Sequence, residues 1–178
     1  MSPARPVTRH ERPFPPATTL VSRTDLEGRI TYANQDFVAI SGYEAHELLG
    51  RSHSMLRHPT MPAATFADLW RTLKAGRSWR GRICNRAKNG DHYWVDAFVS
   101  PYYEQGRVAG YQSVRMAPSR DQVAAAEALY MAVNAGTRPY PAVPRTLTDR
   151  IPFDVRAHLT ALALMAASAS GGLLGYFG

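Results

Sequence analysis

Two strand-like segments lie between Trp79 and Val99, and four residues, Lys-Asn-Gly-Asp at 88–91, join them. In the first segment the odd positions carry mostly apolar side chains, whereas the even positions carry three arginines and Cys84. Side chains two apart lie on the same face of a strand, so the segment has one apolar and one polar face. Asn-Gly tolerates the positive φ of a tight turn. The pattern predicts a β-hairpin whose solvent face includes Cys84.

Asn85 is the polar exception on the apolar face of this hairpin. A buried amide needs hydrogen-bond partners for both its donor and its acceptor. Either a neighbouring backbone group or a flat, polar ligand has to supply them, and the sequence leaves both possibilities open.

The remaining periodicity predicts further strands and helices. Residues 18–24, 29–33 and 108–116 alternate as strands, and residues 34–41, 44–49 and 62–75 read as helices. Asn34 is a good N-cap for the first helix, and Thr60 or Met61 is the expected cap of the third. Two strands, short helices and three antiparallel strands predict an α+β domain, a five-stranded sheet with helices on one face.

The regions outside this domain have different compositions. Residues 1–17 read as a mobile arm, residues 18–118 as the domain, residues 119–136 as a connecting helix with a Ser-x-x-Gln capping box, and residues 137–156 as a proline-broken linker. Residues 157–178 read as a membrane anchor, since from Leu159 onward there is no charged residue and twenty such residues in a helix span about 30 Å, the thickness of a bilayer core. Arginines before this segment predict that the N-terminal domain is cytoplasmic.

Composition limits the possible functions. With 45% hydrophobic residues, the 178-residue chain can form a core, and its single cysteine excludes an intramolecular disulfide. The formal charge of +7 comes without a basic run interleaved with aromatics, so we expect no nucleic-acid binding. No catalytic triad, paired carboxylates, P-loop or Gly-x-Gly-x-x-Gly motif stands out, so we do not expect an enzyme.

Several motifs together make the chain similar to a known family. They are RTDLEG (23–28), ITYAN (30–34), SGY (41–43), RHPTMP (57–62), FADLW (66–70), KNGDHYWV (88–95) and LYMAVNAG (129–136). From about residue 18 to 136 the chain resembles a PAS domain, and more closely the aerotaxis receptors of the Aer family. The resemblance implies FAD as cofactor, redox sensing, a cytoplasmic domain beside an anchor in the inner membrane, and output to the chemotaxis machinery. We also expect a homodimer.

The resemblance implies a set of cofactor-binding residues. Arg57, His58 and Asn85 would bind the flavin, and Asn34, Phe66, Trp79 and Tyr93 would line its pocket. Asn34 is explained equally well as a plain helix cap, and Trp79 and Phe66 as core residues. Tyr93 shares the face of Asn85 if the hairpin loop is long and bulged, with Asn85 opposite Val95. The family has Asp where this chain has Thr60, which we do not expect to contact the ligand.

A looser similarity exists to flavin-binding LOV domains over residues 50–57. His53 stands at the position of their photoreactive cysteine, so no cysteinyl-flavin adduct is expected, and Cys84 on the polar face cannot replace it. LOV domains place a glutamine on the last strand facing the ring, and Gln112 fits that position.

The hypothesis is a redox sensor in which Asn85 and Gln112 flip their amides when the flavin is reduced. Three other classes stay open. A haem-binding gas sensor could use His53, His58 or His92. A cofactor-free interaction module would bind nothing, and a flavin enzyme would need a second substrate site.

Overall fold

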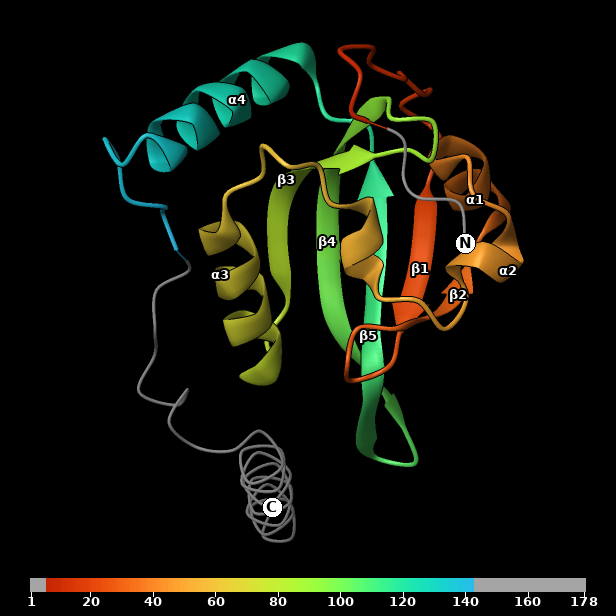
Figure 1. The fold of residues 1–178 in the computed structure, drawn as a ribbon. Helices are drawn as coiled ribbons and strands as arrows, with labels where there is room; N and C mark the ends of the chain where they lie inside the picture. The colour runs from red at the N-terminus through yellow and green to blue at the C-terminus, as the bar shows by residue number, and fades with distance from the viewer. Residues whose placement is uncertain (1–5, 143–178) are drawn as a thin grey trace, which may run out of the picture. The chain divides into compact units, whose positions relative to one another are not determined.

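The computed structural model describes residues 6–142 and is built around one antiparallel sheet (Figure 1). The strands are β1 (Leu20–Thr24), β2 (Ile30–Ala33), β3 (Trp79–Arg86), β4 (His92–Glu104) and β5 (Arg107–Met116). Their order across the sheet is β2-β1-β5-β4-β3, with every neighbouring pair antiparallel. The predicted five-stranded α+β architecture is confirmed.

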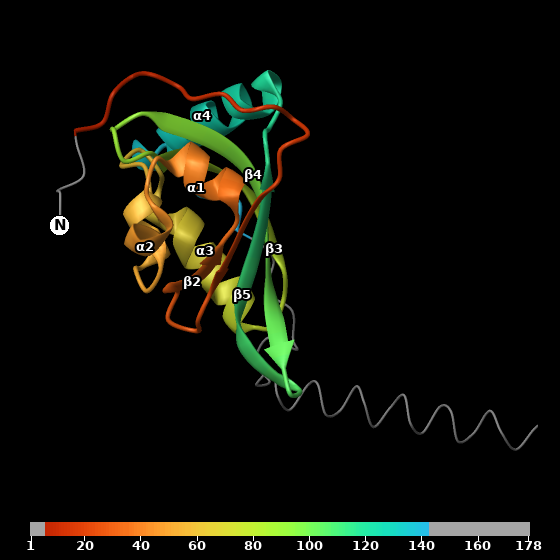
Figure 2. The same cartoon turned by 90° about the vertical axis from the view of Figure 1, so that its right-hand side faces the viewer.

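The helices between β2 and β3 lie on one side of the sheet (Figure 2). They are α1 (Gln35–Ser41), α2 (Ala45–Leu48), the short 3₁₀ helix η1 (His53–Leu56) and α3 (Ala63–Lys74). The last described helix, α4 (Arg120–Asn134), packs against β3, where the Tyr130 hydroxyl donates to the Arg82 carbonyl at 2.5 Å. The space between the sheet and α1–α3 is therefore the interior of the domain.

Local side-chain chemistry explains where most helices begin and end. Asn34 caps α1, where its side-chain oxygen accepts from the Phe37 N–H, and Gly42 ends the helix at φ 70°. Ser119 and Gln122 form the expected reciprocal capping box of α4. The helix predicted over residues 62–75 is confirmed as α3, but its predicted cap, Thr60 or Met61, is wrong, because Pro62 is the N-cap and makes no side-chain cap bond.

The β3–β4 hairpin has a longer turn than a two-residue loop. Asn85 lies opposite Tyr93, and beyond that pair the Ala87 N–H donates to the Asp91 carbonyl at 2.7 Å. The predicted pairing of Asn85 with Val95 is therefore wrong. Tyr93 nevertheless lies on the same face as Asn85, because directly paired residues share a face.

The outer face of the hairpin is covered, which overturns the prediction that Cys84 faces solvent. Cys84 is 2% exposed, and burial raises the pKa of its thiol to about 12. The N-terminal arm contributes to this cover, since the Thr8 N–H donates to the Gly90 carbonyl and the Arg12 N–H to the His92 carbonyl, both at 2.8 Å. The arm is therefore bonded to the hairpin at these two residues.

The predicted linker from residue 143 onward and the predicted membrane helix (157–178) lie outside the described residues. Within residues 6–142, no helix has both the length and the apolar character that crossing a membrane requires.

Candidate functional site

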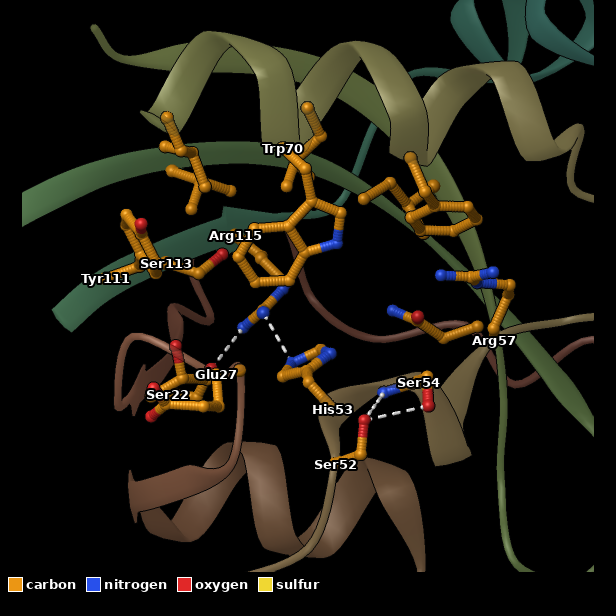
Figure 3. Close-up of a pocket in the computed structure, with 18 residues that line it drawn as sticks. Ser22, Glu27, Ser52, His53, Ser54, Arg57, Trp70, Tyr111, Ser113 and Arg115 are labelled. Carbon is orange, nitrogen blue, oxygen red and sulfur yellow. Dashed lines mark hydrogen bonds between the residues drawn. The ribbon is translucent and has the colours of Figure 1, made fainter. Parts of the chain in front are cut away.

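A cavity of about 250 Å³ lies between the inner face of the sheet and α3 and η1 (Figure 3). Its apolar wall is formed mainly by Phe66, Leu69, Leu73, Ile83 and Val99. Binding sites for small molecules usually measure about 300 to 1,000 Å³. The cavity is therefore large enough for part of a ligand such as a ring system, and the rest of a larger ligand would have to extend outside.

One end of the cavity is formed by a buried cation, Arg115 of β5, which is 4% exposed. Its guanidinium donates to the Ser22 hydroxyl at 3.1 Å and to His53 Nε2 at 2.8 Å (Figure 3). Its carbon Cζ also lies 5.0 Å from the centre of the Phe37 ring. Side chains from β1, η1 and α1 therefore hold the Arg115 guanidinium in place.

The charges in this cluster follow from burial. Burial lowers the pKa of Arg115 to about 10, so the side chain stays cationic at neutral pH. Burial and the neighbouring Arg115 lower the pKa of His53 to about 3, so the imidazole is neutral. Because Nε2 accepts from Arg115, the ring proton of His53 is on Nδ1.

Arg115 forms no ion pair with any carboxylate among residues 6–142. A buried charge without a counter-ion destabilises a fold by several kcal/mol in order of magnitude. Such a group is unfavourable as a purely structural element, and an anionic or acceptor-rich ligand would compensate it.

Three further residues of the cavity carry buried polar atoms without a partner, and we call Arg57, Asn85 and Ser113 the open set. Asn85 and Ser113 are 3% and 5% exposed, yet Asn85 Nδ2, Ser113 Oγ and the buried Nε of Arg57 have no hydrogen-bond partner. The Arg57 guanidinium lies 3.5 Å from the centre of the Phe66 ring, and its backbone forms a bridge with Asn85. Buried polar atoms are nearly always bonded, so these three atoms indicate a missing ligand or water.

Three of the eight site residues predicted from the sequence line this cavity: Arg57, Phe66 and Asn85. Two others have full structural explanations outside it. Trp79 is 1% exposed and its indole N–H donates to Asp68 on α3 at 2.9 Å. The Asn34 side chain bonds three backbone groups, those of Phe37, Val21 and Thr19.

The remaining three predicted residues point elsewhere. His58 bonds Thr60 through Nδ1 at 2.8 Å and lines a separate cleft on the outer side of β3. Tyr93 is fully buried beneath the sheet with an unpartnered hydroxyl, but it does not line the cavity. The expectation that Gln112 faces the ring is wrong, because its amide oxygen accepts from Arg23 at 2.8 Å among exposed residues.

Several residues that line the cavity were not found from the sequence. They are Ser22, His53, Trp70, Tyr111, Ser113 and Arg115. Tyr111, Ser113 and Arg115 alternate along β5, which was the available signal. Since such a row is also typical of a solvent-exposed face, the alternation alone does not show which face of the strand is the inner one.

Residues 30–115 match the family model described as the PAS fold. The chain is 51% identical over 130 residues to the aerotaxis receptor of Escherichia coli, a match that covers 73% of this chain and 26% of the receptor. It is also 32% identical over 100 residues to a nitrogen fixation regulatory protein of Klebsiella pneumoniae, covering 56% of this chain and 20% of that protein. The chain therefore spans only about a quarter or less of these relatives.

Solved structures agree on the fold. A light-oxygen-voltage domain studied with a flavin analogue matches with a TM-score of 0.54 and 23% identity, covering 67% of this chain and 87% of that one. The dark structure of the blue-light photoreceptor Aureochrome1 LOV matches with a TM-score of 0.53 and 20% identity, covering 67% and 86%. The chain contains a domain of the PAS family, and it is similar in sequence to the part of the aerotaxis receptor with which it aligns.

Proposed function

We propose that this domain binds FAD, with the isoalloxazine ring in the interior cavity, and acts as a redox sensor in aerotaxis. The observation that carries the proposal is the polar character of an otherwise apolar cavity. Unpartnered atoms of Asn85, Ser113 and Arg57 and the uncompensated charge of Arg115 all face it.

The chemistry of these residues fits the edge of a flavin. The pyrimidine side of the ring carries carbonyl acceptors and one N–H donor, and its other side is apolar. An amide offers both a donor and an acceptor, and a guanidinium offers donors with a positive charge. The apolar wall from β3, β4 and α3 would bury the flat faces of the ring.

The size of the cavity also sets where the ligand extends. A volume of about 250 Å³ suits the ring and not a whole dinucleotide. Arg57, whose pKa is lowered by burial, is the cation available near this cavity for the ribityl or phosphate part. FAD, and not the ring alone, is assigned from the similarity to aerotaxis receptors.

When bound, the flavin would supply reversible uptake of electrons and a proton, which changes the charge and the hydrogen-bonding character of the ring edge. When the ring edge changes in this way, the Asn85 side-chain amide rotates, so that an acceptor replaces a donor. Arg115, held by Ser22 and His53, supplies a fixed positive charge that favours a more negative ring. Gln112 takes no part, because it lies on the outer face.

Asn85 lies on β3, and the adjacent Cys84 lies on the outer face beneath α4 and the N-terminal arm. A change of bonding at Asn85 would shift β3 against these elements and bias a partner surface between two states. The partners in this proposal are a second copy of the chain and the chemotaxis machinery, and the location is the cytoplasmic side of the inner membrane.

The haem alternative is weaker on this geometry. His53 Nε2 is already occupied by Arg115, while His58 and His92 line a cleft on the other side of β3. A cofactor-free interaction module is the second candidate. It would leave the charge of Arg115 and the open set without partners inside the domain.

The absorption spectrum of the purified chain tests the proposal, before and after reconstitution with FAD and reduction with dithionite. We expect a flavin spectrum that stays with the protein through gel filtration and bleaches on reduction. We also expect FAD to raise the unfolding temperature by mass action. A Soret band would indicate haem. A colourless chain that gains no stability from FAD would reduce the function to protein docking.

A further inference from the structure

A second hollow, the outer cleft, lies on the opposite side of β3 from the interior cavity. It measures about 650 Å³ and is lined by Thr8, Arg9, His58, Thr60, Cys84, His92, Trp94, Glu127, Tyr130, Met131 and Asn134. These residues come from the N-terminal arm, the segment before α3, the β3–β4 hairpin and α4 (Figure 1). Four parts of the chain that are distant in sequence thus form one hollow, whose size is in the usual range for small-molecule sites.

His58 lines this cleft and carries an unpartnered, buried donor. The side chain is 9% exposed, its Nδ1 lies 2.8 Å from the Thr60 hydroxyl, and Nδ1 also accepts from the Thr60 backbone N–H at 3.4 Å. An imidazole nitrogen that accepts a backbone N–H carries no proton itself. The proton of the neutral ring is therefore on Nε2, which is buried and has no partner.

Trp94 presents a second unpartnered donor. The residue is 6% exposed, and its indole stacks on Tyr130 with ring centres 6.2 Å apart. Tyr130 is itself fixed, because its hydroxyl donates to the Arg82 carbonyl at 2.5 Å. The Trp94 Nε1–H can only donate, and it has no acceptor among the described residues.

The two donors and the lining define the chemistry of a ligand. Both lack an acceptor, and a carboxylate provides two acceptor oxygens that form stronger bonds than neutral acceptors. Around the donors the lining is largely aromatic or sulfur-containing, with Cys84, Tyr130 and Met131. The rim carries Arg9 and Glu127, both exposed and of opposite charge, so their effects on an anion largely offset each other.

We propose that the outer cleft is a second ligand site, which binds a small organic acid with an apolar body about the size of an aromatic ring and one carboxylate. The carboxylate accepts from His58 Nε2–H and Trp94 Nε1–H, and the apolar body packs against Tyr130 and Met131. The site does not depend on a flavin in the interior cavity, since its lining residues and those of the cavity do not overlap.

The position of this site also connects it to the interior cavity. Along the same two segments, Arg57 and Asn85 face the interior, while their neighbours His58 and Cys84 face the cleft. The His58 backbone N–H donates to the Cys84 carbonyl at 3.3 Å. A ligand that fixes His58 would therefore act directly on the strand that carries Asn85, and coupling of this kind is reciprocal.

The test is a titration of the ¹⁵N-labelled chain with benzoate, with the indole N–H resonances of its three tryptophans as the readout. Each resonance is assigned by its loss in a Trp→Phe variant. We expect the Trp94 resonance to move in a saturable way, both with and without FAD. The Trp79 resonance should stay in place, because that N–H is already bonded to Asp68.

Two variants and one analogue sharpen the result. Trp94→Phe keeps an aromatic ring and removes the donor, so benzoate, followed by calorimetry because the Trp94 N–H resonance is lost, should bind about tenfold more weakly, as expected for one bond to a charged acceptor. His58→Gln keeps a donor at the position of Nε2 and should bind within about threefold of the unaltered chain. Benzyl alcohol, which has the same ring without a carboxylate, should bind more weakly than benzoate.

Three outcomes would overturn the proposal. Benzoate that moves no indole resonance would mean that water alone fills the cleft. Benzoate that moves only Trp70 would place the acid in the interior cavity. Equal affinity of benzoate and benzyl alcohol would show that no carboxylate is recognised.

Discussion

Two groups of buried or part-buried polar residues in this domain differ in whether the protein itself provides their hydrogen-bond partners. The bonded set, Asn34, Asp68 and Trp79, makes its hydrogen bonds within the protein. The open set, Arg57, Asn85 and Ser113, lines the interior cavity with atoms that have no partner. We therefore expect substitutions in the bonded set to lower stability and substitutions in the open set to weaken ligand binding, although similar residue types occur in both sets.

The largest expected effect is on the bonded set. Asn34→Ala removes the cap of α1 and leaves the part-buried backbone groups of Val21 and Thr19 without the amide. Loss of a cap and of two part-buried hydrogen bonds together should lower the free energy of unfolding by about 3 kcal/mol. Urea denaturation measures it. Asn34→Asp, which keeps the acceptor oxygen, should lose less, and equal losses would mean that the cap is unimportant.

Trp79→Phe is the next test of the bonded set. The change removes the donor to Asp68, whose carboxylate is buried, and should lower the free energy of unfolding by about 2 kcal/mol. The affinity of the folded chain for FAD should change little, because Trp79 does not line the cavity. A large loss of affinity, measured where both proteins are folded, would place Trp79 in the ligand site.

Arg115→Met separates the two kinds of residue most clearly. The cation should contribute to FAD affinity through bonds to a charged or acceptor-rich edge, so its loss should weaken binding by roughly thirtyfold. Stability without FAD should not fall, because replacing a buried, uncompensated charge with an apolar side chain is often neutral or favourable. Denaturant unfolding of the FAD-free chain gives the stability, and a titration with FAD gives the affinity. A marked loss of stability with unchanged affinity would make Arg115 structural.

Within the open set, Asn85→Ala should weaken FAD binding by about tenfold, the value of one hydrogen bond. Without FAD, the variant should unfold at nearly the same denaturant concentration, because the amide nitrogen that it removes bonds nothing in the fold. Ser113→Ala removes another unpartnered atom of the open set and should likewise weaken FAD binding without lowering stability. A strongly destabilised Asn85→Ala chain would move Asn85 into the bonded set.

The smallest expected effect is the dependence of stability on pH. The folded pKa of His53 is about 3, well below its ordinary value near 6.5, so the unfolded chain binds a proton first as the pH falls. The contribution of His53 is therefore complete above pH 6.5 and declines as the pH falls toward 3. Between pH 7 and 6 the loss should be roughly 0.7 kcal/mol. His53→Gln should flatten this slope in part, because burial also lowers the pKa of His58. An unchanged slope would mean that His53 is protonated in the fold.

Local patterns predicted the elements of this fold well. The Asn34 cap, the Ser119 capping box and the apolar stripe of α3 depend on neighbours in sequence, so they could be read directly. The position of Asn85 on the inner face followed from strand alternation. These features need no knowledge of which strands pair.

The site depended on tertiary pairing, which the sequence did not give. Arg115 and Ser22 meet because β1 pairs with β5, and His53 reaches them from η1. Cys84 appeared exposed because the cover from α4 and the arm could not be foreseen. Gln112 was misplaced because its assignment came from a similarity, and an error of one residue in a strand reverses the face.

The side-chain amide resonances of Asn85, followed by ¹⁵N NMR during addition of FAD and then during reduction, test the central claim most directly. The account predicts that the Asn85 amide shifts when FAD binds and shifts again when the flavin is reduced, while the Trp79 indole, bonded to Asp68, changes little. An Asn85 amide that stays in place while FAD is demonstrably bound would contradict a flavin in this cavity.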